Sequence, residues 1–467
     1  MPLVRDIPCR LQTLSVALCA SIILTVGSTG LRPTAQTLGI DDRAQLTARV
    51  RAEFEHAWSS YKRLAWGHDE LNPITRAPHD WYPPAVVYMT PVDALDTMTL
   101  MGMSDEAAQT RRYLLDHLSF DQDVSVQVFE VTIRLLGGLL SAYQMSGDAA
   151  FLALAEDLGT RLLPAFDSPT GMPYRFVNLR TGKTTGEVSN PAEIGTLILE
   201  FGTLGKLTKR DIFYDKAKHA IVEVYRRRDR TTGLVGEEIN VDTGAWASRN
   251  SHIGGGIDSY YEYLLKCQKL FGDDECGAMF RDGIGAVNKY LADDGPRGLW
   301  YGVSDMTTGA RTAATYGSLE AFLPSVLALG GDLDRARRLQ DSNFAMWTLH
   351  GIEPEVLDYK AMKATVESYQ LRPEIIESAY YLFHATHDPK YQAMGRVMFE
   401  DLVKYCRTDD GYTVLKSVVT KERGDRQHSF FLAETLKYLY LLFAPETTLD
   451  LDQVVFNTEA HPLRRTW

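Results

Sequence analysis

The sequence predicts an all-α protein, an (α/α)7 barrel in which an inner ring of helices is surrounded by an outer ring. Two observations carry this prediction. Stretches that are apolar on every side, as expected for fully buried helices, recur at intervals of about 40 to 65 residues. A short turn and a charged, amphipathic stretch follow nearly every one of them. Buried helices that alternate with half-exposed ones indicate one ring inside another.

The inner helices are expected to begin near seven positions, which are Asp93, Glu130, Glu193, Asp258, Ser318, Glu374 and Phe430. An outer helix follows each of the first six. An early helix over residues 41–61 takes the seventh outer position and closes the ring. An open solenoid of helix pairs is the alternative, because repeat proteins share this periodicity.

The lengths of the loops indicate which end of the barrel is functional. Turns from an inner to an outer helix are short, whereas most return loops are long and contain strand-like segments, such as residues 173–187, 233–247, 299–311 and 351–371. Long insertions on one face of a repeat fold commonly mark the functional face. That face carries the N-termini of the inner helices.

Composition limits the possible partners. The 467 residues include 49 Lys and Arg against 61 Asp and Glu, a formal net charge of −12. Nucleic acids and anionic membranes require clustered basic residues, so neither is expected as a partner. We expect a monomer that binds a neutral ligand or a cation.

The N-terminal residues predict export. Arg5 and Arg10 precede an apolar run over residues 14–26, which is shorter than a membrane span requires. We expect residues 1–36 to be a cleaved signal peptide, with no stable membrane insertion afterwards, and residues 37–467 to form a single barrel domain. The sequence leaves open whether Cys267 and Cys276 pair.

Carboxylic acids gather where the inner helices begin. Asp258 and Glu262 are spaced i, i+4, as are Glu130 and Arg134, and Glu374 and Glu377 are spaced i, i+3, so each pair shares one side of a helix. Any single acid could be a helix cap. As a set they would repel one another severely, because only Arg134 and Arg372 are expected nearby, and burying a charge costs several kcal/mol. Protonation or a hard divalent cation with oxygen ligands, such as Ca²⁺, would compensate.

The chain lacks the motifs of several other classes of catalytic site. The chain has no Cys/His cluster for zinc, no glycine-rich phosphate loop and no GxSxG motif for a serine nucleophile. Glycoside hydrolases typically use a pair of carboxyl groups whose surroundings give them different pKa values. The sequence therefore favours a hydrolase that acts on sugars.

Six motifs together resemble glycoside hydrolase family 47, the class I α-1,2-mannosidases. They are VDALDTM, FEVTIRLLGGLLSAY, DSYYEYLLK, RPEIIES, SFFLAETLKYLYLLF and FNTEAHP, in the order of the family, and the similarity runs from Ala65 to the FNTEAHP motif. The resemblance implies an (α/α)7 barrel plugged by a C-terminal hairpin, in agreement with the count of helices. It also implies an exo-acting, inverting hydrolase of terminal α-1,2-linked mannose in oligosaccharides.

The resemblance implies a calcium site and a set of catalytic and sugar-binding residues. Thr458 would bind Ca²⁺ directly, and Glu355, Glu374, Glu377, Glu434 and Glu459 would bind it through water. Glu374 matches the general base and Glu130 the usual candidate for the general acid, with Asp258 as the rival acid. Asp93, Arg134, Glu193, Glu262, Arg372, Phe430 and Glu434 would position the sugar.

Several positions depart from the family pattern. Gly256 stands where some members have an arginine that selects the mannose branch. Ala321 and Asn343 stand where eukaryotic members carry a disulfide, which together with the signal peptide favours an exported bacterial protein, periplasmic or secreted. A mannose-binding protein that has lost catalysis is the alternative function, although every expected catalytic acid is present.

Overall fold

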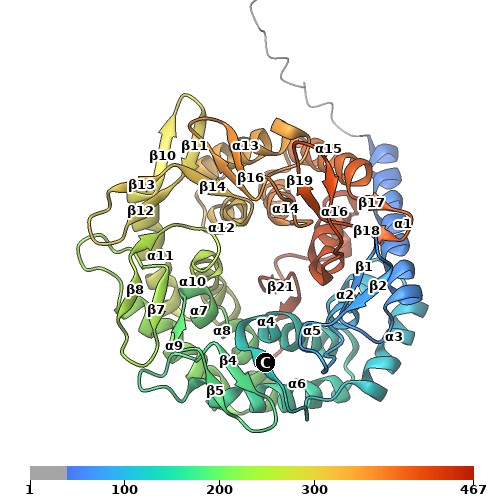
Figure 1. Cartoon of the computed structure of the whole chain (residues 1–467), viewed down its shortest axis with the longest axis horizontal. Helices are drawn as coiled ribbons and strands as arrows, with labels where there is room; N and C mark the ends of the chain where they lie inside the picture. The colour runs from blue at the N-terminus through green and yellow to red at the C-terminus, as the bar shows by residue number, and fades with distance from the viewer. Residues whose placement is uncertain (1–38) are drawn as a thin grey trace, which may run out of the picture. The chain divides into compact units, whose positions relative to one another are not determined.

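The computed structural model describes residues 39–467, and the predicted signal peptide at residues 1–36 lies outside them. Within the described residues, seven inner helical segments form a closed ring, and seven outer helices surround it (Figure 1). This arrangement confirms the predicted (α/α)7 barrel. None of the helices in this part of the chain is both long and apolar enough to cross a membrane.

The inner ring combines continuous and interrupted helices. Three segments are continuous, namely α2 (Met89–Leu100), α10 (Asp258–Phe271) and α14 (Glu374–Thr386). The others are α4 (Val128–Val131) with the π-helical turn η1 (Thr132–Leu136) and α5 (Gly137–Ser146), α7 (Pro191–Gly195) with α8 (Ile198–Thr208), the 3-10 turn η3 (Leu319–Phe322) with α12 (Leu323–Leu329), and the π-helical turn η4 (Phe431–Thr435) with α16 (Leu436–Phe443). Most of their residues are buried, as their apolar sequences predict.

One inner helix begins earlier than the sequence predicts. Helix α2 starts at Met89, four residues before Asp93. The carboxylate of Asp69, about 20 residues upstream, accepts hydrogen bonds from the backbone N–H groups of Val87 and Met89 at 3.0 and 3.2 Å. A side chain distant in sequence therefore fixes this helix start, which local patterning does not reveal.

The outer ring follows the predicted order. It comprises α1 (Ile40–Leu64), α3 (Ser104–His117), α6 (Ala149–Leu162), α9 (Asp211–Arg226), α11 (Asp274–Tyr290), α13 (Leu333–His350) and α15 (Lys390–Tyr405). Helix α1 packs against α16 and closes the ring, as expected for the early helix. Asp148, Asp273 and Asp332, in the short turns between inner and outer helices, cap α6, α11 and α13 by accepting backbone N–H groups.

The long return loops form small antiparallel sheets at one end of the barrel. Their members are β3 (Ser125–Gln127), β4 (Phe176–Asn178) and β5 (Thr184–Thr185); β6 (Val188–Ser189), β7 (Glu238–Asn240) and β8 (Trp246–Ser248); β9 (Asn250–Ser251), β12 (Val303–Asp305) and β13 (Arg311–Ala313); and β14 (Thr315–Gly317), β15 (Val356–Asp358) and β16 (Lys363–Val366). In each sheet, the strand that precedes an inner helix pairs with a strand of the following return loop. Neighbouring repeats are thereby joined at the end where the inner helices begin.

A C-terminal hairpin occupies the centre of the ring (Figure 1). Its strands are β21 (Val454–Phe456) and β22 (Pro462–Arg464), and it packs against α10 and α5. Lys437 of α16 donates a hydrogen bond to the carbonyl oxygen of Ala460 at 2.6 Å, and Asn457 donates to the carbonyl oxygen of Ile133 at 2.8 Å. These bonds hold the connection between the strands inside the inner ring.

Two features concern the cysteines and the missing family disulfide. Cys267 of α10 and Cys276 of α11 form a disulfide, which settles the pairing that the sequence left open. Cys406 is buried and has no disulfide partner within residues 39–467. At the position of the missing disulfide, the side-chain amide of Asn343 donates a hydrogen bond to the carbonyl oxygen of Ala321 at 3.3 Å. Polar contact therefore links these two positions here.

The close packing of α7 against the neighbouring helices can be tested by substitution. A Cβ atom at Gly195 would lie 2.8 Å from the ring of the buried Tyr260 and 3.2 Å from Ile221. We predict that Gly195→Ala lowers the free energy of unfolding by about 1–3 kcal/mol, because the core is overpacked. Gly285→Ala is the matched control, since Gly285 of α11 is exposed with no atom within 4 Å of its Cβ position. It should raise stability by about 0.5–1 kcal/mol. Urea unfolding of both variants measures the difference, and equal effects would contradict this packing.

Candidate active site

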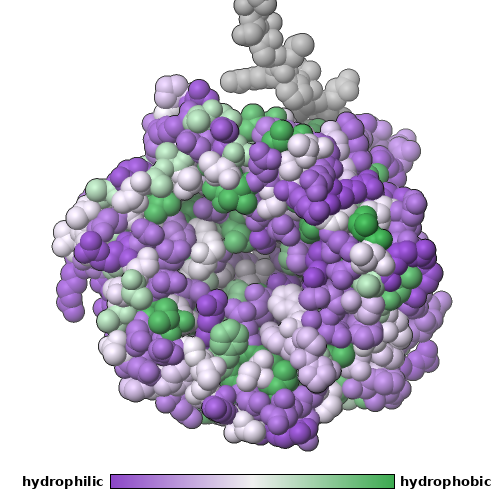
Figure 2. Space-filling view, viewed as in Figure 1, coloured by the Kyte–Doolittle hydropathy of each residue, from purple (hydrophilic) through white to green (hydrophobic). Residues whose placement is uncertain are grey.

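A cavity of about 610 Å³ opens at the centre of the ring. The space-filling view shows the hollow with hydrophilic residues around it (Figure 2). Its lining comes from the first turns of the inner segments that begin with α4, α7, α10, η3, α14 and η4, from the return loops before them, and from the C-terminal hairpin. The cavity therefore lies at the end of the barrel that the return loops indicated.

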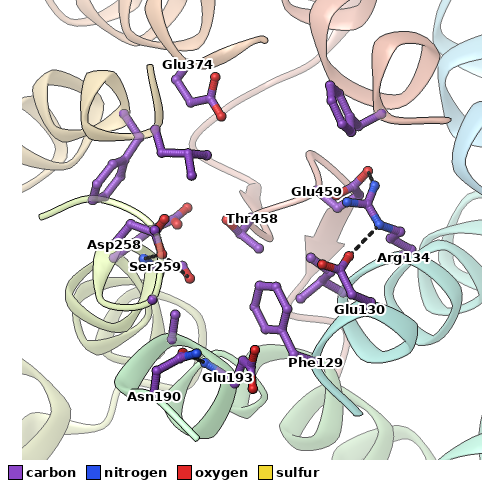
Figure 3. Close-up of a pocket in the computed structure, with 18 of the residues that line it drawn as sticks. Phe129, Glu130, Arg134, Asn190, Glu193, Asp258, Ser259, Glu374, Thr458 and Glu459 are labelled. Atoms are coloured by element: carbon purple, nitrogen blue, oxygen red, sulfur yellow. Dashed lines mark hydrogen bonds and ion pairs between the residues drawn. The ribbon is translucent and has the colours of Figure 1, made fainter. Parts of the chain in front are cut away.

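Twelve of the predicted site residues line this one cavity. They are Glu130, Arg134, Glu193, Asp258, Glu262, Arg372, Glu374, Glu377, Phe430, Glu434, Thr458 and Glu459. Figure 3 shows Glu130 and Asp258 facing each other across the cavity, with Glu374 on a third side and Thr458 between them. Asp93 and Glu355 lie outside the lining, each behind an arginine that does line it.

Arg134 joins three carboxylates on one side of the cavity. Its Nε donates to Glu130 at 2.9 Å, and its Nη1 contacts Glu459 and lies 3.7 Å from Asp93. The guanidinium also lies over the ring of Phe430, 5.6 Å from its centroid. Arg134 sits in the π-helical turn η1, a distortion that is frequent at functional sites.

Arg372 lies on the side of the cavity that carries Glu374, and a carboxylate holds its guanidinium. Its guanidinium donates to Glu355 at 3.0 and 3.2 Å, and it also faces the ring of Phe430. Glu374 follows two residues later as the first residue of α14, and one of its carboxyl oxygens is buried without a hydrogen-bond partner. Glu355 thus orients Arg372 beside a carboxyl group that the protein leaves partly unsatisfied.

Burial and mutual repulsion raise the pKa values of the acids in the cavity. Burial raises the pKa of Glu374 to about 8, against the opposing charge of Arg372 and with repulsion from Glu355. Burial likewise raises the pKa of Asp258 to about 7, although it accepts the backbone N–H of Ser259. The pKa values of Glu377, Glu434 and Glu459 are raised by burial and by the charges of neighbouring carboxylates. Protein cations alone therefore leave the site short of positive charge.

Thr458 presents two oxygen atoms to this group of acids. Its backbone N–H donates to the hydroxyl of Tyr263 at 3.1 Å, which fixes the residue at the tip of the hairpin. Within residues 39–467, neither the side-chain hydroxyl nor the carbonyl oxygen of Thr458 has a hydrogen-bond partner. Two free oxygens beside several carboxyl groups match the ligand preference of a hard divalent cation.

Sequence reasoning missed several residues of the site. Lys266 is buried on α10 and forms an ion pair with Glu262, and Arg175 enters from the return loop before α7, so Arg134 and Arg372 are not the only cations nearby. The i, i+4 spacing of Glu262 and Lys266 could have indicated this pair. Glu353 is fully buried with neither carboxyl oxygen hydrogen-bonded, and burial together with Glu374 raises its pKa. No local pattern marks Arg175 or Glu353.

The hairpin is held by a buried group of charges behind the cavity. Asp96 accepts from the Nζ atom of Lys437 and pairs with Nδ1 of His461, each at 2.7 Å. Asp93 lies 3.4 Å from the other ring nitrogen of His461. Although burial opposes it, the two aspartates raise the pKa of His461 to about 9, while Lys437 and His461 hold the pKa of Asp96 at about 2.

Comparison with known proteins gives the family. The model of glycosyl hydrolase family 47 matches residues 53–465. The chain belongs to this family. It is 36% identical over 487 residues to alpha-mannosidase I MNS5 of Arabidopsis thaliana, covering 98% of this chain and 83% of the relative. It is 38% identical over 457 residues to the human mannosyl-oligosaccharide 1,2-alpha-mannosidase IB, covering 91% and 70%.

Solved structures agree with the family assignment. The α-1,2-mannosidase from Trichoderma reesei superposes with a TM-score of 0.83 at 26% identity, covering 90% of this chain and 99% of that chain. Cellobiose 2-epimerase from Bacillus thermoamylovorans, at 12% identity and a TM-score of 0.57, shares the fold alone. As a member of family 47, the protein is a glycoside hydrolase, as the sequence predicted.

The prediction of an exported bacterial protein, periplasmic or secreted, is wrong. The relatives that match this chain in sequence include plant and mammalian proteins, and those from mouse and rat include proteins named for the endoplasmic reticulum. The prediction relied on the signal peptide and on the missing disulfide at Ala321 and Asn343. Neither feature identifies the source of a chain, and a hydrogen bond joins the two positions in place of the disulfide.

The charge of His461 gives a pH-dependent prediction. A group with a raised pKa in the folded state stabilises fully below its unfolded value, here about 6.5, and that contribution is lost as the pH rises through the folded value of about 9. The free energy of unfolding should therefore fall by up to roughly 3 kcal/mol more in the wild type than in His461→Gln between pH 6.5 and 9. Urea unfolding at several pH values measures this difference. The exposed His117→Gln is the control, and a pH dependence identical in all three proteins would contradict the assignment.

Proposed function

We propose that the protein is an exo-acting, calcium-dependent, inverting α-1,2-mannosidase that removes terminal α-1,2-linked mannose from oligosaccharides. The observation that carries the proposal is that Glu130, Asp258 and Glu374 face one cavity whose inner end carries Thr458 of the hairpin. A cavity blocked by a hairpin admits the end of a glycan rather than its middle. Names of the relatives support the α-1,2-linked mannoside as substrate. We also propose that residues 37–467 form a single catalytic domain.

The residues around Thr458 fit a calcium site. The threonine hydroxyl and carbonyl oxygen would hold the ion directly, and Glu374, Glu377, Glu434 and Glu459 would hold its water ligands, with Glu355 further away behind Arg372. A bound Ca²⁺ would lower the pKa values of these carboxyl groups and would supply a ligand for sugar hydroxyls. The unpartnered oxygens of Thr458 and the unpartnered carboxyl oxygen of Glu374 are the observations that support this fit.

Inverting hydrolysis requires a base that activates water on one face of the sugar and an acid that protonates the leaving oxygen on the other. Glu374 is the base in this proposal, because it lies in the cavity with a free carboxyl oxygen. Two carboxyl groups compete for the role of acid. Asp258 is supported by a pKa of about 7, raised mainly by burial, which keeps a proton available near neutral pH. Glu130 is supported by the family resemblance.

The other lining residues would bind and orient the sugar. Phe430 offers an apolar ring held between two guanidinium groups, and Arg134 and Arg372 can donate to sugar hydroxyls. Glu262 and Glu434 are acceptors, whereas Asp93 acts on the sugar only through Arg134, since it lies outside the cavity. Glu193 lines the side of the cavity opposite Glu374.

The stereochemistry of the product tests the function directly. With an α-1,2-linked mannobioside, the first mannose released should be the β-anomer, because water attacks the face opposite the leaving group. Proton NMR during the first minutes resolves the two anomers before they equilibrate. Initial α-mannose would contradict inversion. Tight binding of the glycan without any turnover would instead support the binding-only alternative.

Substitution of the three acids separates their roles. Glu374→Gln should lower kcat by roughly 10²–10⁴-fold on both a mannobioside and α-mannosyl fluoride, because each needs the base. Replacing the acid, by Glu130→Gln or Asp258→Asn, should lower kcat on the mannobioside by a similar factor but largely spare the fluoride, because fluoride leaves without a proton. The exposed Glu422→Gln is the control. If neither acid variant spares the fluoride, general-acid catalysis by these two residues is contradicted.

Calcium dependence is tested by turnover and by thermal stability together. Chelation with EDTA should abolish turnover and lower Tm, and added CaCl2 should restore both, because ligand at 100 times its Kd stabilises the folded state by about 2.7 kcal/mol. Thr458→Val keeps the side-chain volume but removes the hydroxyl, so its Tm should respond less to calcium. Thr420→Val, at an exposed position, should respond like the wild type. A Tm and a turnover indifferent to EDTA would contradict the calcium site.

A further inference from the structure

The outer part of the cavity is lined by a second group of polar residues, away from Glu374. Figure 3 shows Glu193 and Asn190 on the side opposite Glu374, beyond Asp258. Gln127 and Arg175 join them in the lining, from the strand before α4 and from the return loop before α7. This group is built by two neighbouring repeats of the barrel, so it belongs to the collar of return loops rather than to the buried acids.

Arg175 is held rigidly at its backbone. Its N–H donates to the carbonyl oxygen of Gly186 at 3.0 Å, and its own carbonyl oxygen accepts the N–H of Val128, the first residue of α4, at 3.0 Å. The side chain is 42% exposed and one Nη atom lies 2.8 Å from Glu193. The backbone therefore fixes where the guanidinium enters the cavity.

The carboxylate of Glu193 is already occupied by the protein. Gln127 donates to one of its oxygens at 2.9 Å and Ser189 to the other at 3.2 Å, in addition to the contact with Arg175. By contrast, Glu193 is the only ionic or hydrogen-bonding partner of the Arg175 side chain within residues 39–467. A guanidinium carries five N–H groups, so Arg175 retains donors that no protein group uses. Sugar hydroxyls can accept them.

The wall next to this group carries no side chains. Gly255 and Gly256 line the cavity between Asn190 and Asp258. Gly256 has a φ of +93°, a conformation that favours glycine, and a Cβ atom there would meet only Asn190, at 3.7 Å. The backbone of this loop is fixed, because the carbonyl oxygen of Gly256 accepts the N–H of Ala192 at 2.9 Å. Open space therefore lies beside Asn190, in the same cavity that Arg175 lines.

We propose that Arg175, held by Glu193 and Gln127, binds the sugar that leaves in the reaction, in the space beside Gly255 and Gly256, and so determines which oligosaccharides are accepted. This inference rests on the proposed function. The free N–H groups of Arg175 donate to hydroxyls of the leaving sugar, while the terminal mannose lies deeper, beside Glu374. A site that hydrogen-bonds a hydroxyl discriminates strongly against substrates that lack it.

The test compares two substrates that differ only in the leaving group. An α-1,2-linked mannobioside presents a leaving sugar, whereas α-mannosyl fluoride presents none. Arg175→Ala should lower the ratio of kcat/KM for the mannobioside to that for the fluoride by about tenfold to a hundredfold, the effect of losing a hydrogen bond to a charged group. Arg175→Lys, which keeps one donor cation, should restore part of the ratio. Arg180→Ala is the matched control, since Arg180 lies on the same hairpin, pairs with Asp121 and should leave the ratio unchanged.

Each other outcome contradicts the proposal. An unchanged ratio in Arg175→Ala means that this residue does not contact the leaving sugar. An equal loss on both substrates means that it acts on the terminal mannose or on the fold. A failure of the proposed function is distinguishable, because the wild type would then hydrolyse neither substrate.

Discussion

Ten carboxylic acids line one cavity at the centre of the barrel, against three arginines, and the repulsion among them is the constraint on which the rest of the site depends. Six of these ten acids are buried, and each uncompensated buried charge costs several kcal/mol. The protein compensates locally: Arg134 contacts Glu130 and Glu459, Arg372 contacts Glu355, and Lys266 contacts Glu262. Within residues 39–467, neither Glu374 nor Glu434 forms an ion pair, although Arg372 and Arg134 lie near enough to lower their pKa values in part. Burial is the main cause of their raised pKa values, which indicate that the nearby cations do not fully compensate these carboxyl groups.

Irregular backbone places the charges at the mouth of the barrel. Regular helices would direct side chains along fixed rows, but the inner segments that carry Arg134 and Glu434 each contain a π-helical turn, and the segment that carries Glu193 is broken before α8. The hairpin then brings Thr458 and Glu459 into the same cavity from the end of the chain. Buried ion pairs of Asp96 with Lys437 and His461 hold it there. The charged residues that hold the hairpin are therefore connected to those that line the cavity.

The ring of helices could be predicted from the sequence because its signal is local. Fully apolar runs such as that of α14 predict buried helices, and the spacings of Glu130 with Arg134 and of Glu374 with Glu377 predict which side chains share a face. These two patterns together predict that the acids gather at one end of the barrel. The proposed role of Thr458 as a calcium ligand, in contrast, comes only from resemblance to a family, since a threonine near the chain end carries no local signal.

What sequence reasoning missed depends on contacts between distant segments. Asp69 sets the start of α2 through backbone hydrogen bonds that no periodicity reveals. Arg175 reaches the cavity because strands of neighbouring return loops pair, and Glu353 is buried beside Glu374 by the fold of a loop that reads as polar. Asp93 and Glu355 lie outside the cavity lining in which the sequence prediction put them, because an arginine stands between each of them and the cavity.

We propose that burial keeps several of these carboxyl groups protonated until a divalent cation replaces the protons. Calorimetric titration of the calcium-free protein with CaCl2 at pH 7, repeated in buffers of different ionisation enthalpy, counts the protons released per ion bound. We predict tight binding of one Ca²⁺ with release of at least about one proton, since burial raises the pKa of Glu374 to about 8 before the ion binds. Binding without proton release, or no binding at all, would contradict it.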